Sequence, residues 1–176
     1  MTVTDLRYPI GLYEPLHNTT ATQRAALIDN LAAAPQQLRA AVQDLSAAQL
    51  DTPYRPDGWT VRQLVHHVAD SHLNSYIRFR WTLTEVEPLI KAYDEKAWAA
   101  LPDARTADPA LSLVLLDSLH ARWVLLLRSL SPEQWLQRLQ HLEAGWLSLE
   151  TMLGLYDWHG RHHIAHITNL RERMAW

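Results

Sequence analysis

Apolar residues recur with helical spacing in four long stretches of this chain. The stretches cover about residues 20–45, 60–84, 109–130 and 148–173. Glycine is scarce, with 5 residues in 176, and the prolines lie mostly between the periodic segments, which is typical of helical proteins. The pattern predicts an all-α fold, a four-helix bundle in which an apolar side of each helix faces a common core.

Local signals mark where helices begin. Thr60 is followed by Gln63 in the capping-box pattern, and Asp108 places a capping acid before Pro109 at the first helical position. Pro35 lies inside the first stretch, where a proline should kink or divide a helix. We therefore expect defined starts for the second and third long helices, and a bent or broken first helix.

The connections between the long helices are of mixed length. Residues 51–59 form a proline-containing rigid loop, and residues 85–108 form a long connection with a short extra helix around residues 95–101. A further short helix starts at Ser131, and residues 137–147 form a loop or a brief strand pair. No repeat or linker divides the chain, so residues 1–176 are predicted to form a single domain.

Composition excludes several classes of function. The formal net charge is -3, and no Lys/Arg-rich block occurs, so neither nucleic acid nor a membrane surface is an expected partner. The absence of cysteine excludes disulfides, thiolate ligands and a protein-borne thiol nucleophile. The N-terminus lacks a signal-peptide pattern and the longest apolar runs are too short to cross a bilayer. These features predict a soluble intracellular protein.

The candidate chemistry lies in histidines, because the chain has no Gly-rich phosphate loop, no GxSxG elbow and no HExxH motif. Four histidines fall into eight positions of the last helix, and at 100° per residue they lie within about 100° of its circumference. They are His159, His162, His163 and His166. Apolar residues such as Met152 share this arc, and a buried ring nitrogen needs a partner. A divalent metal is the simplest common partner.

Spacing alone does not identify the ligand pair. His159 and His163 are four residues apart, and so are His162 and His166, so both pairs can point at one object. The pair that does not bind would then donate or accept hydrogen bonds around the metal. Both alternatives remain open on helical geometry.

The second helix offers a third ligand. His67 lies off the apolar side of this helix, on a stripe with Ser71, Asn74 and Arg78. Such a stripe is usually a solvated face, and this is the simpler interpretation of Asn74 and Arg78. Two histidines leave a metal under-coordinated, whereas three imidazoles supply the three protein ligands of an open catalytic site. Imidazoles suit zinc, nickel, iron, cobalt or copper better than calcium or magnesium.

The remaining histidines suggest no second site. His17, His120 and His141 stand alone in the sequence, and we expect them to be ordinary surface or core residues. His72 falls on the apolar side of the second helix, together with Val68 and Tyr76. We expect that side to pack into the core.

The chain resembles the DinB-like superfamily, and more closely its YfiT-type branch of metal-dependent hydrolases, to which bacillithiol transferases belong. The resemblance covers nearly the whole chain. It rests on YPIG at residues 8–11, LDTPYRP at 50–56, GWTVRQ at 58–63, HHVADSH at 66–72 and WHGRHHIAHI at 158–167.

The resemblance implies a ligand set. The family pattern has one metal-binding histidine on the second helix, followed by an apolar residue, and an H-x-x-x-H pair on the last helix. These positions match His67, His159 and His163. The resemblance also implies one divalent metal per subunit, zinc or nickel, a homodimer and a cytoplasmic location.

Three functions follow from such a site. A low-molecular-weight thiol at the open position would become a nucleophilic thiolate, and the resemblance favours transfer of bacillithiol or a similar thiol to an electrophile. The alternative is a hydrolase, because zinc lowers the pKa of bound water to about 7 and gives a metal-bound hydroxide. The non-enzymatic alternative is a structural metal clip between the second and last helices.

Several further residues are candidates to surround the site. Asn74, Arg78 and Tyr156 could hold an anionic or polar co-substrate such as bacillithiol, although a surface or packing role is the simpler interpretation of each alone. His162 and His166 are expected to be neighbours of the metal.

Overall fold

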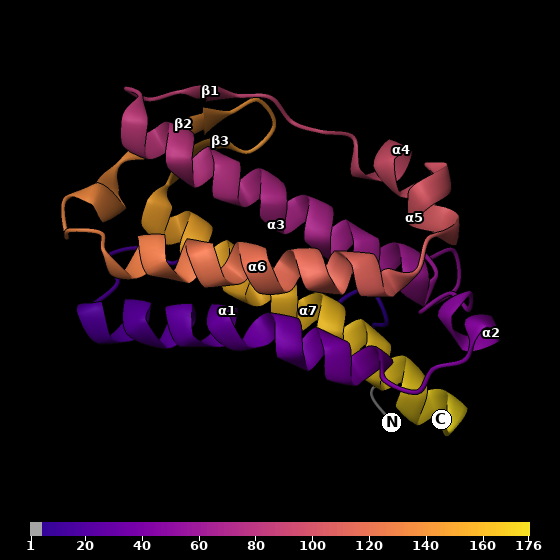
Figure 1. Ribbon diagram of the computed structural model, residues 1–176. Helices are drawn as coiled ribbons and strands as arrows, with labels where there is room; N and C mark the ends of the chain where they lie inside the picture. Colours follow the sequence, from indigo (N-terminus) through magenta and orange to yellow (C-terminus); the bar gives the residue numbers. More distant parts are fainter. Residues whose placement is uncertain (1–4) are drawn as a thin grey trace.

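Four long helices form the body of the computed structural model, which describes residues 5–176. They are α1 (Ala21–Val42), α3 (Val61–Thr84), α6 (Pro109–Arg128) and α7 (Leu149–Met174). Helix α1 packs against α6 and α7, and α3 packs against the same two helices. In Figure 1, α1 and α7 run in one direction and α3 and α6 run in the other. The expected four-helix bundle is confirmed, and the fold is mostly helical.

The helix starts follow the capping signals of the sequence. The Thr60 hydroxyl accepts a hydrogen bond from the Gln63 backbone N–H at 3.2 Å, and the Gln63 side chain accepts one from the Thr60 N–H at 3.0 Å. Asp108 accepts from the Ala110 N–H at 2.9 Å, directly before α6. Each contact satisfies a backbone donor that the first helical turn leaves free.

Helix α1 continues through Pro35, so of the expected bend or break, the break does not occur. Pro35 is buried, and it lies between Leu31 and Leu38, which are each 1% exposed. Burial of its ring against the bundle core offsets the hydrogen bond that a proline removes from a helix.

The connections carry short elements. These are α2 (Ala47–Leu50), β1 (Leu89–Ile90), α4 (Glu95–Ala99), α5 (Pro102–Thr106), η1 (Gln134–Leu136), β2 (Arg138–His141) and β3 (Gly145–Ser148). The predicted extra helix corresponds to α4, and the predicted strand pair is the antiparallel hairpin of β2 and β3. Strand β1 joins it in parallel, which the sequence does not show because two residues carry no periodicity. The sheet lies near the C-terminal end of α3. Helices α4 and α5 lie toward the N-terminal end of α3 (Figure 1).

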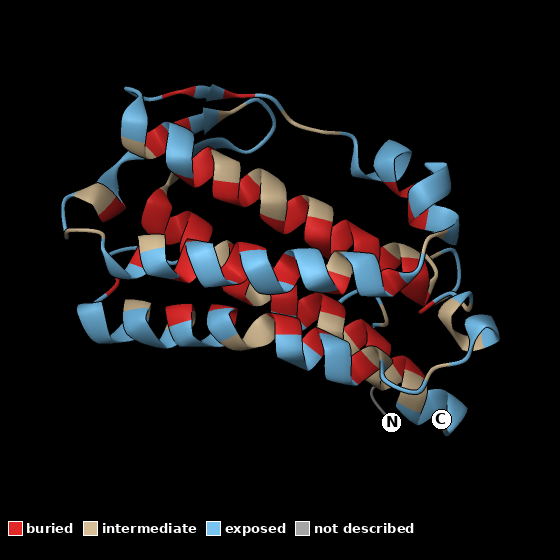
Figure 2. Ribbon diagram, viewed as in Figure 1, coloured by how far each residue is buried: buried red, intermediate tan, exposed pale blue. Residues whose placement is uncertain are grey.

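The bundle core consists of two apolar clusters along the helix axes. One contains Phe79 and Trp123, each 0% exposed, and the other contains Val61 and Leu64, each also 0% exposed. Figure 2 shows the buried residues along the inner sides of the helices. On α3, α6 and α7 a layer that contains histidines separates the two clusters, and this layer positions the candidate site.

Within residues 5–176, α6 is the one helix long and apolar enough to span a membrane by length and composition. It packs against α1 and α3, and its inner residues, including Leu116 and Leu127, are buried. Core helices of bundles share this length and composition.

Candidate metal centre

Three histidines from two facing helices meet on one side of the bundle. His67 comes from α3, and His159 and His163 come from α7. One ring nitrogen of each lies within 4.8 Å of a ring nitrogen of the other two. Helical spacing explains the α7 pair, because residues four apart share a face, and the packing of α3 on α7 brings His67 to them.

The distances suit a metal ion. Nε2 of His159 lies 3.2 Å from Nε2 of His163. A tetrahedral metal at its usual bond length of about 2.0–2.1 Å separates two imidazole nitrogens by about 3.3–3.4 Å. The His67 ring centroid is 5.3 Å from that of His159 and 4.9 Å from that of His163. The three rings therefore fit one ion of the kind that imidazoles bind.

Burial keeps these rings neutral. It lowers the pKa of His67 to about 4. Burial also lowers the pKa of His159 and His163 well below the usual histidine range, and repulsion from neighbouring histidines adds to the effect. At neutral pH each ring therefore has a free lone pair on one nitrogen, as metal ligation requires.

The three histidines face a cavity of about 610 Å³. Its other walls include aromatic residues and charged residues of both signs. They are Arg7, Tyr8, Tyr54, Arg55, Asp57, Gly58, Trp59, Glu95, Lys96, Trp158, His162 and His166. The volume falls in the range of small-molecule sites. A metal held by these three ligands would present an open coordination position to a small molecule.

His162 and His166 line the same cavity as the three-histidine cluster. Their Nε2 atoms are 3.0 Å apart, and with His163 they form a second group that could hold a metal. Burial lowers the pKa of His162 to about 4. Burial, followed by repulsion from His162 and Arg55, lowers the pKa of His166 to about 3. Both rings are therefore neutral neighbours of the first cluster.

Tyr156 lies beneath the cluster. It is 4% exposed, and its ring centroid is 5.6 Å from that of His159. Its hydroxyl lies 3.5 Å from Oγ of Ser71, which in turn is 3.4 Å from Nε2 of His159. Tyr156 therefore supports the site from inside the bundle and is absent from the lining of the cavity.

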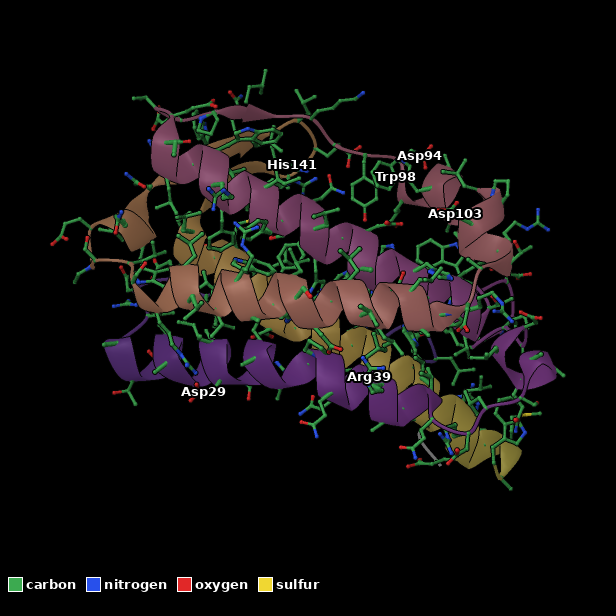
Figure 3. The ribbon with its side chains drawn as sticks, viewed as in Figure 1. Asp29, Arg39, Asp94, Trp98, Asp103 and His141 are labelled. Carbon is green, nitrogen blue, oxygen red and sulfur yellow. The ribbon has the colours of Figure 1, made fainter. Side chains whose placement is uncertain are left out.

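The structure places Asn74 and Arg78 away from the three histidines. Both line a separate cavity of about 670 Å³, with Trp81, Trp98 and the β1 segment. Helix α4 stands between the two cavities, because Glu95 and Lys96 line the first. Ala97 of α4 and the preceding Asp94 line the second, where Figure 3 shows Asp94 and Trp98 close together. Arg78 is 7% exposed, so the expectation of a solvated face is wrong for this residue.

Two histidines that the sequence did not connect with the site lie directly behind it. His72 of α3 is 0% exposed and His120 of α6 is 2% exposed, and their rings stack with centroids 5.0 Å apart. Burial, followed by repulsion from His120 and His159, lowers the pKa of His72 well below its usual range, and burial lowers that of His120 to about 4. The packing of α6 against α3 brings the two rings together, and one isolated histidine in α6 gives no sequence signal of it.

Known proteins share this sequence and architecture. Residues 30–167 match the DinB superfamily. The chain is 52% identical over 177 residues to "Putative metal-dependent hydrolase YfiT" of Bacillus subtilis (strain 168), with 100% of this chain and 99% of the relative covered. A Bacillus mycoides (strain KBAB4) relative with the same hydrolase description is 52% identical over 172 residues, with 98% of this chain and 99% of the relative covered.

A solved structure is similar over almost the full length. YfiT from Bacillus subtilis matches with a TM-score of 0.95 and 52% identity, over 97% of this chain and 98% of that chain. That protein is described as having "an unusual four-helix bundle topology". In the present chain, neighbouring helices α1 and α7 run in the same direction (Figure 1).

Proposed function

The chain belongs to the DinB superfamily and is a metal-dependent enzyme, and we propose that it transfers a low-molecular-weight thiol to an electrophile. The proposed ligands of one divalent metal, zinc or nickel, are His67, His159 and His163. The observation that carries the proposal is the position of three neutral histidines on the wall of a cavity that admits a small molecule. The resemblance of the sequence to thiol transferases of the YfiT type supports the choice of thiol, with bacillithiol as the first candidate.

The ligand count favours catalysis over a structural clip. Structural zinc sites are usually closed by four protein ligands. Among the described residues, the group around His67 contains three candidate ligands, and its open side faces the cavity. A metal bound there would lower the pKa of a thiol or a water molecule that occupied the remaining position.

The cavity walls suit a thiol that also carries amino and carboxylate groups. Arg55 and Lys96 contribute positive charge, and Asp57 and Glu95 contribute negative charge. Nε of Arg55 is buried without a hydrogen-bond partner among the described residues, so it is available to an acidic group of the ligand. Trp59 and Trp158 cover the His67 and His162 rings and limit the access of water.

The chemical step consumes only the two substrates, the thiol and the electrophile. The thiol gives its proton to solvent, its sulfur forms a bond to the electrophilic carbon, and the leaving group departs with the electron pair of the broken bond. For monochlorobimane the carbon–chlorine bond breaks and chloride leaves. Charged wall residues such as Arg55 would orient the thiol so that its sulfur, and not another group, faces the electrophile.

Incubation of zinc- or nickel-loaded protein with monochlorobimane and a panel of thiols tests this function. Bacillithiol, cysteine, coenzyme A and glutathione form the panel, and His141→Ala is the control variant because His141 lies in the β2–β3 hairpin (Figure 3). We expect conjugation well above the no-enzyme rate for the wild type and the control, and loss in His163→Ala. Conjugation no faster than without enzyme overturns the transferase proposal.

Hydrolysis is the second candidate, because the relatives are named as metal-dependent hydrolases. Water in the open position would then replace the thiol. Metal-dependent cleavage of chromogenic esters and amides without added thiol, together with background conjugation of monochlorobimane, would select this function. The same ligands, His67, His159 and His163, serve both reactions.

We further propose that the protein acts in the cytoplasm as a homodimer. Helix α6 presents apolar side chains to solvent, with Leu111 67% and Leu125 72% exposed, and a second copy would cover such a surface. Sedimentation equilibrium should give twice the mass of one chain, and Leu125→Lys should shift the protein toward one chain. A wild-type protein that sediments as a single chain contradicts the dimer.

A further inference from the structure

The rings of His120, His72 and His159 form a continuous series of contacts, here called the histidine series, from helix α1 to the three-histidine cluster. Nδ1 of His120 lies 2.7 Å from the carbonyl oxygen of Leu31. Nε2 of His120 lies 2.9 Å from Nδ1 of His72, and Nε2 of His72 lies 3.2 Å from Nδ1 of His159. The histidine series crosses the layer between the two apolar clusters of the core, where a polar atom without a partner is costly.

Pro35 explains why a backbone carbonyl inside α1 is available to a side chain. In a regular helix the carbonyl of Leu31 would accept from the N–H four residues later. That residue is Pro35, which has no N–H. The helix is continuous at this point, so the carbonyl of Leu31 has no donor at that position and His120 takes its place.

The Leu31 carbonyl determines the direction of every hydrogen bond in the histidine series. A carbonyl oxygen can only accept, so Nδ1 of His120 must donate. A neutral imidazole has one donor and one acceptor nitrogen, so Nε2 of His120 accepts and Nδ1 of His72 donates. By the same rule Nε2 of His72 accepts, and Nδ1 of His159 carries the hydrogen. Nε2 of His159 is then left with its lone pair.

We propose that His72 and His120 are positioning residues, which hold His159 in the Nδ1–H tautomer so that its Nε2 faces the metal. Hydrogen bonds from ligand histidines to second partners orient the ring and set the tautomer. His159 has such a partner, whereas Nδ1 of His163 is buried without one among the described residues. The histidine series therefore acts on one of the three proposed metal ligands, His159. Its effect would be the same for thiol transfer and for hydrolysis.

Ring tautomers in the metal-free wild-type protein provide the first test. Long-range ¹H–¹⁵N correlation spectra of histidine-labelled protein show which nitrogen of each ring carries the hydrogen. We expect hydrogen on Nδ1 in His120, His72 and His159. A His159 ring with its hydrogen on Nε2 overturns the proposal. This measurement needs no variant and no enzyme activity, so it succeeds or fails independently of thiol transfer.

Zinc affinity of paired variants provides the second test, measured by competition with a chromophoric chelator. His72→Leu removes both the donor and the acceptor, and we expect its affinity for Zn²⁺ to fall by about 10–100-fold, as for other partners of metal-binding histidines. His72→Gln retains an amide donor and acceptor, so its affinity should stay closer to that of the wild type. An unchanged affinity in His72→Leu overturns the proposal.

Pro35→Ala distinguishes an effect of the hydrogen bond between the Leu31 carbonyl and His120 from an effect of general stability. Alanine supplies an N–H that competes with His120 for the Leu31 carbonyl, and it also favours the helix relative to proline. We expect weaker Zn²⁺ binding without a loss of helical structure. Leu127→Ala in α6 is the control, because it opens a cavity in the core and should lower stability while Zn²⁺ affinity stays at the wild-type value. Wild-type Zn²⁺ affinity in Pro35→Ala contradicts the role of the Leu31 carbonyl and, with it, the direction of the hydrogen bonds in the histidine series.

Discussion

Acidification should destabilise the metal-free protein steeply below pH 6.5, because its buried histidines cannot accept protons. The pKa of His67 and of His120 is lowered from 6.5 to about 4 in each case, by burial. In the unfolded chain both rings take up a proton as the pH falls below about 6.5, whereas in the folded protein they remain neutral until about pH 4. The unfolded state therefore binds more protons in this window, and the free energy of unfolding falls with pH.

The expected loss of unfolding free energy is large. For one histidine with these two pKa values, the free energy of unfolding falls by about 2 kcal/mol between pH 7 and pH 5. His67 and His120, which are 4% and 2% exposed, together account for about 4 kcal/mol. Single domains have total stabilities of about 5–15 kcal/mol, so the metal-free protein should approach its limit of stability near pH 5.

Urea unfolding of chelator-treated protein, followed by tryptophan fluorescence at several pH values, measures this loss. His120→Gln removes one of the buried histidines. The pH slope of its unfolding free energy should be smaller than that of the wild type by about 1 kcal/mol per pH unit between pH 6 and pH 5. His17→Gln is the matched control, because His17 is exposed and its ring is hydrated in both states. A wild-type free energy of unfolding that changes by less than about 1 kcal/mol from pH 7 to pH 5 would show that the buried histidines accept protons in the folded state.

Three further predictions concern stability. Zn²⁺ at 100 times its dissociation constant should raise the free energy of unfolding by about 2.7 kcal/mol at pH 7, and His163→Ala should abolish this increase in thermal or urea unfolding. Glu150→Gln should lower stability by about 2–3 kcal/mol, because the Glu150 carboxylate accepts hydrogen bonds from Asn18 and Thr19 at 2.8–3.0 Å; an effect below about 0.5 kcal/mol would show that these bonds are not needed. Thr60→Ala should cost about 1 kcal/mol through loss of the α3 cap, and an unchanged urea midpoint would contradict the cap's contribution.

The helices were predictable because their signals are local. Thr60 with Gln63 and Asp108 with Pro109 define helix starts through contacts within three residues, and helical periodicity places the four α7 histidines on one face. Pro35 has a local effect too, but whether it divides α1 depends on the core into which its ring packs. A sequence shows the missing N–H and not the compensating burial.

The cluster was only partly predictable. Spacing places four histidines on one face of α7 but leaves two ligand pairs open. The choice of His159 and His163, and of His67 on another helix, came from the family resemblance. His120 required the packing of α6 against α3, which no periodicity within one helix reveals. Asn74 and Arg78 lie on the same helix as His67 but line the other cavity, because α4 separates the two, and the path of residues 85–108 was not predicted beyond one short helix.

The metal content of two histidine variants shows whether the three-histidine cluster binds a metal ion. Purified wild-type, His163→Ala and His141→Ala proteins are loaded with Zn²⁺ or Ni²⁺, desalted and analysed by inductively coupled plasma mass spectrometry. His163 belongs to the three-histidine cluster, whereas His141 lies in the hairpin of β2 and β3. We expect one metal per chain in the wild type and in His141→Ala, and almost none in His163→Ala. Equal metal content in the two variants would contradict this expectation.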